Sequence, residues 1–207
     1  MLKLKRILYK ISVWFFGLSV GLVVFFKFVP VPFTPLMGIR IIENKLDKKP
    51  IYFEHNWEPI ENISMNLQKA VIASEDGTFL HHHGFDFSAM QKAFQNNASG
   101  KRIKGGSTIS QQTAKNVFLW QGRSYFRKAL EAYFTVLIEL IWGKERIMEV
   151  YLNSIEMGDG IYGAHAATQY WYGKDASSLT KIQAAGIAAI LPNPRKFKAS
   201  NSSSYIE

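Results

Sequence analysis

The stretch Val71-Ile-Ala-Ser-Glu-Asp-Gly-Thr-Phe-Leu-His-His-His-Gly84 decides how the rest of the chain is interpreted. Apolar and small residues recur at helical spacing over residues 63–74, which predicts one buried helix face. This helix would end at two adjacent acids, Glu75 and Asp76, which a glycine follows. A carboxylate at the end of a rigid element, beside apolar surface, can have its pKa raised enough to transfer protons near neutral pH. The alternative is that both acids are simply solvated.

The composition is that of one folded domain with a tail. The chain has 207 residues, of which 47% are hydrophobic and 14% aromatic, enough for a sizeable core. It contains no cysteine, which excludes disulfides and thiolate metal sites. The net charge is +9, and residues 1–30 hold five cations and no acid. More than half of the imbalance therefore lies at the N-terminus, which favours a membrane surface as partner and argues against nucleic acid.

The N-terminal segment is predicted to be a membrane anchor. Residues 11–26 form an uncharged, mostly apolar run, and the longer segment 7–31 suffices for a span of about 20 residues. Lys10 and Lys27 flank the run, and both side chains can reach the membrane surface. The cations before the run predict a cytoplasmic N-terminus, with the rest of the chain outside the plasma membrane. A cleaved signal peptide is the alternative, but no Ala-x-Ala site follows the run.

The chain is therefore divided into two parts. Residues 1–45 are predicted to be a cytoplasmic tip, a transmembrane helix and a linker, in which Pro30, Pro32 and Pro35 form a stiff connector. Residues 46–207 are predicted to form one mostly α-helical domain with at most a minor hairpin. The polar, glycine-bearing segment 96–106 is expected to be a loop. Further helices are expected at 85–94, 127–142, 144–153, 164–172 and 179–191.

A second informative stretch runs over residues 105–116 and opens on two glycines. Thr108 and Gln111 have the spacing of a helix capping box. A helix N-terminus with free N–H groups binds anions, and Lys104 and Lys115 add positive charge. The stretch is not a Walker A loop, because the Gly-Lys-Ser/Thr ending is missing. The alternative is an ordinary capped helix after a loop.

Arg127 and Glu131 lie four residues apart at the start of a strongly apolar helix. A local ion pair is one interpretation, although the cation precedes the acid, which is the weaker orientation. The other interpretation is a second working carboxylate in a basic pocket. The consecutive histidines at 81–83 cannot easily reach one metal ion and have no His-Glu-x-x-His beside them, so a packed or solvated cluster is favoured.

A series of motifs follows in a fixed order along the chain. They are Glu75-Asp-x-x-Phe79-x-x-His82-x-Gly84, Gly105-x-Ser107-Thr108-x-x-Gln111-Gln112-x-x-Lys115-Asn116, Arg127-Lys128-x-x-Glu131, Lys144-Glu-Arg-Ile-Met-Glu-Val-Tyr-Leu-Asn153, Ile161-Tyr-Gly-x-x-Ala-Ala167 and Tyr172-Gly-Lys-x-Ala176. Together they resemble the peptidoglycan glycosyltransferase family, most closely its monofunctional members, which have one N-terminal membrane helix and no transpeptidase domain. The resemblance covers residues 57–198, and the anchor in kind.

The resemblance implies an all-α, two-lobed fold related to lysozyme, on the periplasmic side of a bacterial inner membrane. The substrate would be lipid II, a disaccharide-pentapeptide on undecaprenyl pyrophosphate. The reaction would extend β-1,4 glycan strands and release the lipid pyrophosphate, with inversion at the donor sugar. Partners would be the growing glycan strand, membrane lipid and other cell-wall synthesis proteins.

The resemblance also implies roles for single residues. Glu75 matches the catalytic base, and Glu131 matches a second glutamate that either holds a metal or orients Arg127 and its neighbours. A divalent cation, Mg or Mn, could share the work at the pyrophosphate. The expected substrate- and pyrophosphate-binding residues are Lys92, Lys104, Ser107, Thr108, Gln111, Gln112, Lys115, Arg123 and Arg127. The expected structural residues of the first motif are Asp76, Phe79, His82 and Gly84.

The chain departs from the family pattern at two points, and two other functions are considered. Gln183 stands where the family has a glutamate, and we expect it to be structural. The family usually continues with another helix after the Pro-Asn-Pro region, and the sequence leaves open whether the chain is truncated at Glu207. The other functions are a lysozyme-like glycan hydrolase, which also uses paired carboxylates, and a non-catalytic anchored scaffold for wall synthesis. The hydrolase gives no reason for the cations Lys115 and Arg123.

Overall fold

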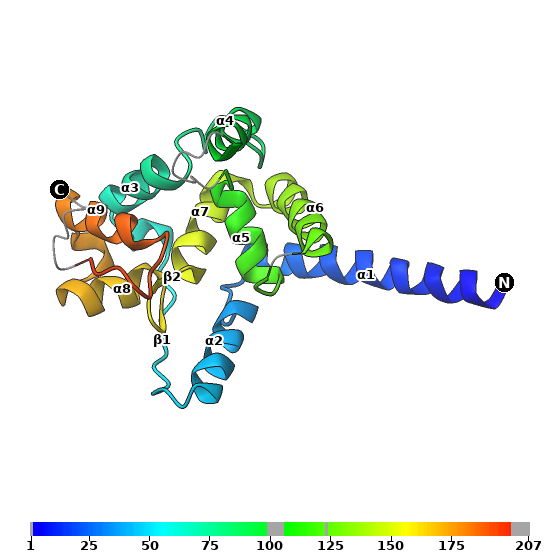
Figure 1. Ribbon diagram of the computed structural model, residues 1–207, viewed down its shortest axis with the longest axis horizontal. Coiled ribbons are helices and arrows are strands. Elements are labelled where there is room, and N and C mark those ends of the chain that lie inside the picture. The colour runs from blue at the N-terminus through cyan, green and yellow to red at the C-terminus, as the bar shows by residue number, and fades with distance from the viewer. Residues whose placement is uncertain (1, 99–105, 123, 200–207) are drawn as a thin grey trace.

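A computed structural model describes residues 2–98, 106–122 and 124–199. Two of the expected pyrophosphate-binding cations, Lys104 and Arg123, lie outside these residues. The described chain is mainly helical, as predicted, with one small sheet (Figure 1). Its elements are α1 (Leu2–Phe28), α2 (Pro35–Leu46), β1 (Glu54–His55), η1 (Ile60–Asn62), α3 (Met65–Glu75), α4 (Phe87–Ala98), α5 (Ile109–Phe118), α6 (Tyr125–Ile141), α7 (Gly143–Ser154), β2 (Glu156–Gly158), β3 (Ile161–Tyr162), α8 (Gly163–Tyr172), η2 (Ala176–Ser178) and α9 (Lys181–Ile190).

The core lies around α5, which packs against both α6 and α7, while α3 packs along α9 (Figure 1). The α5–α6 contact includes the stacked rings of Phe118 and Phe134, whose centroids are 4.6 Å apart. On α7 the predicted inward residues Ile147, Val150 and Tyr151 are fully buried. Apolar residues three and four positions apart on these helices thus form one continuous core, which fixes where the ends of α3 and α5 meet.

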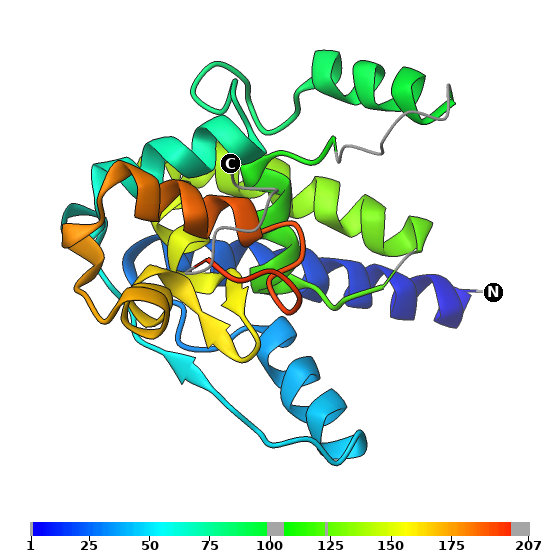
Figure 2. The ribbon, with the colours of Figure 1, turned by 60° about the vertical axis from the view of Figure 1, so that its left-hand side comes forward.

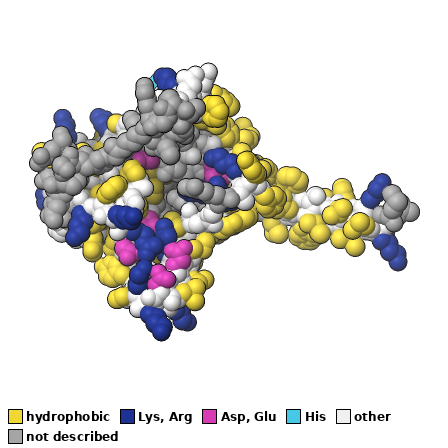
Figure 3. Space-filling view, in the orientation of Figure 1, with side chains coloured by type: hydrophobic (Ala, Val, Ile, Leu, Met, Phe, Trp, Pro, Cys, Tyr) yellow, Lys and Arg dark blue, Asp and Glu magenta, His cyan; other side chains and the backbone are white. Residues whose placement is uncertain are grey.

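Helix α1 projects from the body, and the face seen in Figure 3 carries many hydrophobic side chains, with cations near its free end (Figures 1 and 3). It is long and apolar enough to span a membrane, and only 11% of its most apolar 18-residue window is buried. Its C-terminal end is fastened to the body, because the Trp142 indole N–H donates to the Val23 carbonyl at 2.7 Å. Arg146 also donates to the carbonyls of Phe26 and Val29, at 2.8 and 2.7 Å. The helix is therefore docked on α6 and α7 rather than freely tethered.

The connector after α1 differs from the prediction at its last proline. Pro35 does not extend the connector but begins helix α2, where its fixed φ and missing N–H suit the first turn, and Thr34 caps that turn. Arg40 on this helix pairs with Glu43 at 2.7 Å and with Glu156 at 3.1 Å. Figure 3 shows acidic and basic side chains gathered over the region of α2.

Helix α4 stands at the edge of the body, apart from the packed helices (Figure 2). It begins at Phe87, two residues later than expected, because the Asp86 carboxylate accepts the Ala89 backbone N–H at 2.8 Å and so caps the first turn. It continues to Ala98, so the expected loop over 96–106 is wrong at its first three residues. In the expected two-lobed arrangement, α4 corresponds to the smaller part and the packed helices of the main body correspond to the larger part.

The small sheet has the order β1-β3-β2, in which β3 pairs parallel with β1 and antiparallel with β2. The turn between β2 and β3 contains Gly160, whose φ is +75°. A Cβ at that position would lie 2.1 Å from the Tyr52 carbonyl oxygen, so only glycine permits this approach. The Glu54 N–H donates to the Gly160 carbonyl at 2.9 Å, which fixes residues 52–54 against the hairpin.

Candidate active site

Glu75 is the last residue of α3, and its carboxylate lies against α5. The Gln112 side-chain amide donates to Glu75 Oε2 at 2.9 Å. The hydroxyl of the fully buried Tyr151 in turn donates to Gln112 Oε1 at 3.3 Å, which holds the amide in this orientation. Glu75 thus receives its only side-chain hydrogen bond within the described chain from a neutral group.

The surroundings of Glu75 raise its pKa above the ordinary value. Burial is the largest cause, because the charged form loses water, and the adjacent Asp76 charge acts in the same direction. The Gln112 hydrogen bond and the positive charge of Lys115 oppose the shift. The carboxylate is therefore more basic than an ordinary glutamate, as the first motif predicted.

Asp76 differs from Glu75, because its carboxylate accepts hydrogen bonds from other groups inside the protein. It is buried and accepts the Ile109 backbone N–H at 2.9 Å and a hydrogen bond from His82 Nε2 at 2.9 Å. The Gly84 N–H donates to His82 Nδ1 at 3.1 Å, which assigns the histidine proton to Nε2. Asp76 and His82 therefore join the first motif to the start of α5.

The start of α5 holds the capping box that the sequence predicted. Thr108 accepts the Gln111 N–H, and the Gln111 side chain accepts the Thr108 N–H at 3.0 Å. Since Asp76 takes the Ile109 N–H as well, the anion held at this helix end is the protein's own carboxylate. The expectation that a helix N-terminus offers free N–H groups to a ligand is therefore wrong for the N–H groups of Thr108, Ile109 and Gln111.

Gly84 makes a close approach that only glycine permits. Its φ is +90°, and a Cβ would lie 2.8 Å from Thr135 Cγ2 on α6. The Gly84 carbonyl accepts the Thr108 hydroxyl at 2.7 Å. The loop of the first motif is therefore clamped between α5 and α6.

A small cavity of about 80 Å³ opens beside Glu75, between the first motif, α4 and the start of α5. Ser107 and Thr108 line it, as does Ala89 on α4. Lys92 is exposed one helical turn beyond Ala89, and within the described residues it makes no ion pair. Ser107 and Thr108 thus line the same cavity as Glu75, whereas Lys92 is not among its lining residues.

Glu131, the second predicted carboxylate, is buried on α6 and paired with cations of its own helix. Arg127 donates to Glu131 Oε2 at 2.7 Å, and Lys128 donates to Oε1. The local ion pair of the first interpretation is therefore present, and it is buried. The second interpretation, that Glu131 is a working carboxylate, stays a prediction. Arg127 is held further by the Gly122 carbonyl, which accepts its Nε–H at 2.8 Å.

The positive charge of Lys115 interacts with both glutamates, Glu75 and Glu131. Burial lowers the pKa of its ammonium, Glu131 and Glu75 raise it, and Arg127 and Lys128 lower it. The Lys115 ammonium makes no hydrogen bond or ion pair to any described residue, so its charge is available to a ligand. The structure thus brings together Glu75, Lys115 and Glu131 from three different motifs.

A further, partly buried charge cluster was not predicted from the sequence. Glu139 Oε1 accepts hydrogen bonds from the Ser110 hydroxyl and from Lys144 Nζ, the latter at 2.7 Å. The Lys144 ammonium also lies 4.6 Å from the centroid of the buried Phe79 ring. A lone acid inside the apolar run of α6 was the signal that could have indicated it. Through the contact between Lys144 and Phe79, the cluster supports the first motif.

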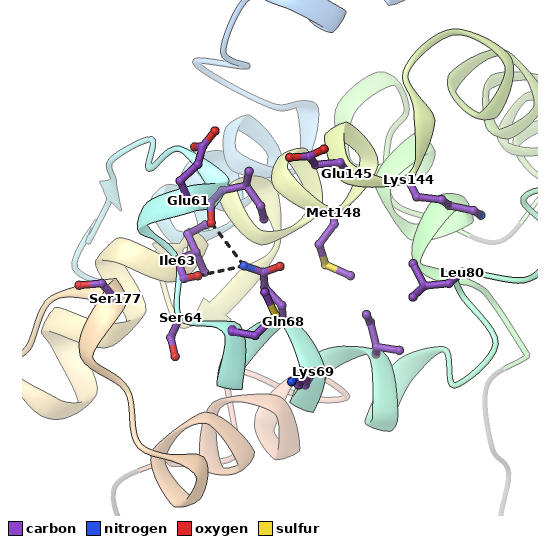
Figure 4. A pocket seen from close by; sticks show the side chains of 13 residues that line it. Glu61, Ile63, Ser64, Gln68, Lys69, Leu80, Lys144, Glu145, Met148 and Ser177 are labelled. Atoms are coloured by element: carbon purple, nitrogen blue, oxygen red, sulfur yellow. Dashed lines mark hydrogen bonds between the residues drawn. The ribbon is translucent and has the colours of Figure 1, made fainter.

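A larger hollow, a groove of about 710 Å³, lies between α3 and α7 and is lined by both apolar and polar side chains (Figure 4). Leu80 and Lys144 border it, and the Gln68 amide within it donates to the Ile63 carbonyl at 2.9 Å. Neither Glu75 nor Glu131 lines this groove. The candidate chemistry therefore lies at the smaller cavity, and size alone does not identify the site.

Comparison with known proteins agrees with this geometry. A family model described as Transglycosylase matches residues 44–207. A biosynthetic peptidoglycan transglycosylase of Caulobacter vibrioides is 56% identical over 184 residues, which is 89% of this chain and 78% of that protein. Proteins of the same name from Pseudomonas putida and Bdellovibrio bacteriovorus are 52% and 50% identical, covering 97% and 98% of this chain and 85% and 81% of their own lengths. The chain therefore belongs to the transglycosylase family, and it is a peptidoglycan glycosyltransferase with the lysozyme-like helical domain of that family.

Proposed function

We propose that the protein polymerises lipid II into β-1,4 glycan strands and releases undecaprenyl pyrophosphate, with Glu75 as the general base. The observation that carries the proposal is the raised pKa of a partly buried Glu75 whose described hydrogen-bond partner is a neutral amide. The acceptor is a sugar 4-hydroxyl, a poor nucleophile, and such a carboxylate can remove its proton during attack. Attack opposite the leaving group would invert an α-linked donor into a β-1,4 product.

The leaving pyrophosphate gains negative charge in the transition state, and fixed cations stabilise it there. Lys115 is the best placed described cation, because it is partly buried, near Glu75 and without a protein partner within the described chain. Arg127 and Lys128 add charge on the same side but are already bound to Glu131. We therefore assign the main described phosphate contact to Lys115.

Glu131 is proposed to position cations rather than to hold a metal. Both of its oxygens accept hydrogen bonds from cationic groups, an arrangement that does not fit a divalent ion at the same carboxylate. Among the described residues, no cluster of three or more His, Asp or Glu side chains could hold a metal. No step of the proposed reaction is routed through a metal ion at Glu131.

The anchor gives the reaction its location. We propose that α1 crosses the bacterial inner membrane with its basic end in the cytoplasm and that residues 46–207 work on the periplasmic side, with residues 1–45 as anchor and linker. Enzyme and lipid-linked donor then share one surface. The fastening of α1 by Trp142 and Arg146 supports a fixed orientation of the site relative to that surface.

The test is lipid II turnover by the full chain in detergent, with and without EDTA. Glu75→Gln is expected to lower polymerisation by roughly 10²–10⁴-fold while lipid II binding persists, because only proton transfer is lost. Normal polymerisation by this variant would exclude Glu75 as the base and favour a scaffold role. Release of soluble muropeptides from purified cell wall would favour the hydrolase instead.

A further inference from the structure

A second concave surface lies far from Glu75, between the strand segment 52–56 and helix α8. It is a trough of about 330 Å³, which we call the β1–α8 trough. Tyr52, Glu54 and Asn56 alternate along the extended segment and so present one face to it. Helix α8 contributes His165 and Tyr170 from one side of its surface, together with Ala166 and Gln169.

Two exposed aromatic rings form one wall of the trough. The side chains of Tyr52 and Tyr170 are 47% and 55% exposed, and their ring centroids are 6.2 Å apart. Behind them, Trp171 contacts the Tyr170 ring edge-on at 4.8 Å and donates its indole N–H to the Met157 carbonyl. Large rings kept at the surface and supported in this way provide flat apolar faces for a ligand.

The polar groups of the trough are available and of the right kind for sugars. Within the described chain, the side chains of Glu54 and Asn56 make no hydrogen bond. His165 uses Nδ1 to pair with Glu58 at 3.0 Å, which leaves Nε2 for a ligand. Carboxylate, amide and imidazole groups are the donors and acceptors that hydroxyl and acetamido groups require.

The charge of the trough argues against an anionic ligand. No lysine or arginine lines it, although the chain as a whole carries a net charge of +9. Glu54 would repel a phosphate or a carboxylate placed there. A neutral sugar has no such penalty, and the C–H face of a pyranose ring suits the negative face of tyrosine. The larger groove of Figure 4 differs in both respects, because Lys69 and Lys144 are among its lining residues and no aromatic side chain is.

The trough is also rigid and lies far from the free end of the anchor. Residues 52–54 are fixed by the β1–β3 pairing and by the close approach of Gly160 to the Tyr52 carbonyl. In both ribbon views α8 lies on the side of the body opposite to the free end of α1 (Figures 1 and 2). With α1 in a membrane, α8 and the trough beside it would lie on the side of the body distant from the lipid, where polymerised glycan lies.

We propose that the β1–α8 trough is a second saccharide site, which binds a neutral stretch of β-1,4-linked amino-sugar strand. The proposal rests on the glycan chemistry of the proposed function, but it does not depend on Glu75 acting as the base. A strand held there would remain near the enzyme between additions, so strand length rather than the rate of a single addition would depend on the trough.

The binding test uses chitohexaose, a neutral β-1,4-linked N-acetylglucosamine hexamer, with the full chain in detergent. Calorimetry gives the affinity, and hydrogen exchange shows which segments become protected. The doubly substituted Tyr52→Ala/Tyr170→Ala protein is expected to bind about tenfold more weakly or worse, since both stacking faces are lost. Tyr52→Phe/Tyr170→Phe keeps both faces and should bind within about threefold of the unsubstituted chain.

Two controls separate this site from the active site. Tyr125→Ala removes a tyrosine that is 97% exposed at the start of α6, away from the trough, and should not change binding. Glu75→Gln should leave protection of residues 52–56 and 165–170 intact. Absence of that protection, or unchanged affinity in the double alanine protein, would overturn the proposal even if lipid II polymerisation is confirmed. Conversely, if these segments are protected but the protein does not polymerise lipid II, the proposed function would be wrong and the proposed saccharide site would remain supported.

In the polymerising enzyme, the double alanine protein is expected to consume lipid II at an unchanged initial rate and to make shorter strands. Gel analysis of labelled product measures both quantities. Unchanged strand length with weakened chitohexaose binding would contradict the proposed use of the trough.

Discussion

Glu75 and Glu131 are the same side chain in two opposite environments. Glu75 receives a hydrogen bond from the neutral Gln112 amide and has a pKa raised by burial. Glu131 is more deeply buried but is bound to two cations, Arg127 and Lys128, on its own helix. A carboxylate without a cationic partner can take up a proton, whereas one bound to two cations serves to hold them in place. The partners, rather than the depth of burial, separate a base from a positioning group.

The comparison is tested first by stability. Glu131→Gln leaves the buried Arg127 guanidinium without its counter-charge and is expected to lower the free energy of unfolding by about 3–5 kcal/mol. Glu75→Gln should not lower it near neutral pH. Denaturant unfolding of both proteins in detergent, monitored by circular dichroism, measures the difference. Equal losses in the two variants would mean that the environments are not distinct.

The pH dependence of the free energy of unfolding shows whether the charged form of Glu75 stabilises or destabilises the fold. Because its folded pKa is raised, its contribution to stability is present below the ordinary glutamate pKa and is lost as pH rises through the raised value. Glu75→Gln removes that loss. The variant should therefore be more stable than the unsubstituted chain above the raised pKa, and the difference should disappear in acid.

A second prediction compares two cations that the sequence placed in one group. Lys115→Met is expected to weaken donor binding by about 1.5–3 kcal/mol, the range for a hydrogen bond to a charged group. Lys92→Met should cost less, because Lys92 is exposed on α4. The Michaelis constants for lipid II measure both effects. A larger loss at Lys92 would show that α4 approaches the pyrophosphate more closely than Lys115 does.

A third prediction uses two identical helix caps. Thr108 and Thr180 both form capping boxes, with Gln111 and Gln183, but only Thr108 also donates to Gly84 in the first motif. Either alanine substitution should cost about 0.5–2 kcal/mol of stability. Thr108→Ala should in addition lower kcat, whereas Thr180→Ala should leave it unchanged. Equal kcat values would show that the clamp on the first motif does not position Glu75.

The smallest expected effect is a pH shift. The Gln112 amide stabilises the charged form of Glu75, so Gln112→Leu should raise the Glu75 pKa further. Since the base must be deprotonated, kcat/KM falls as pH falls through this pKa, and the acid limb should move to higher pH in the variant. Profiles of kcat/KM for both proteins measure the shift. A shift to lower pH would contradict the assigned direction of the hydrogen bond.

Local patterns predicted much of the fold. Helix periods, the capping box at Thr108 and the inward residues of α7 were all recovered, because each depends on neighbours within one turn. Pro35 was misplaced because a proline both ends one helix and begins the next, and only the path of the chain decides which. Gln183 is structural, as expected, since it completes the cap of α9.

Contacts between distant segments could not be predicted in this way. The bonds of Asp76 to Ile109 and of Glu139 to Ser110 join residues about 30 positions apart, and no local pattern encodes them. The same holds for α1, whose end is fastened by Trp142 and Arg146 more than 100 positions later. The sequence indicated an anchor but not its docking.

The sequence by itself determined which residues carry charge, which segments are helical, and that an apolar segment precedes a helical domain. It did not decide which carboxylate would be left without a cation. That depended on the packing of α3, α5 and α6, which brought Gln112 to Glu75 and left Arg127 and Lys128 on Glu131. The reason is that a pKa depends on burial and on neighbouring charges within a few ångströms, and only the tertiary structure supplies both.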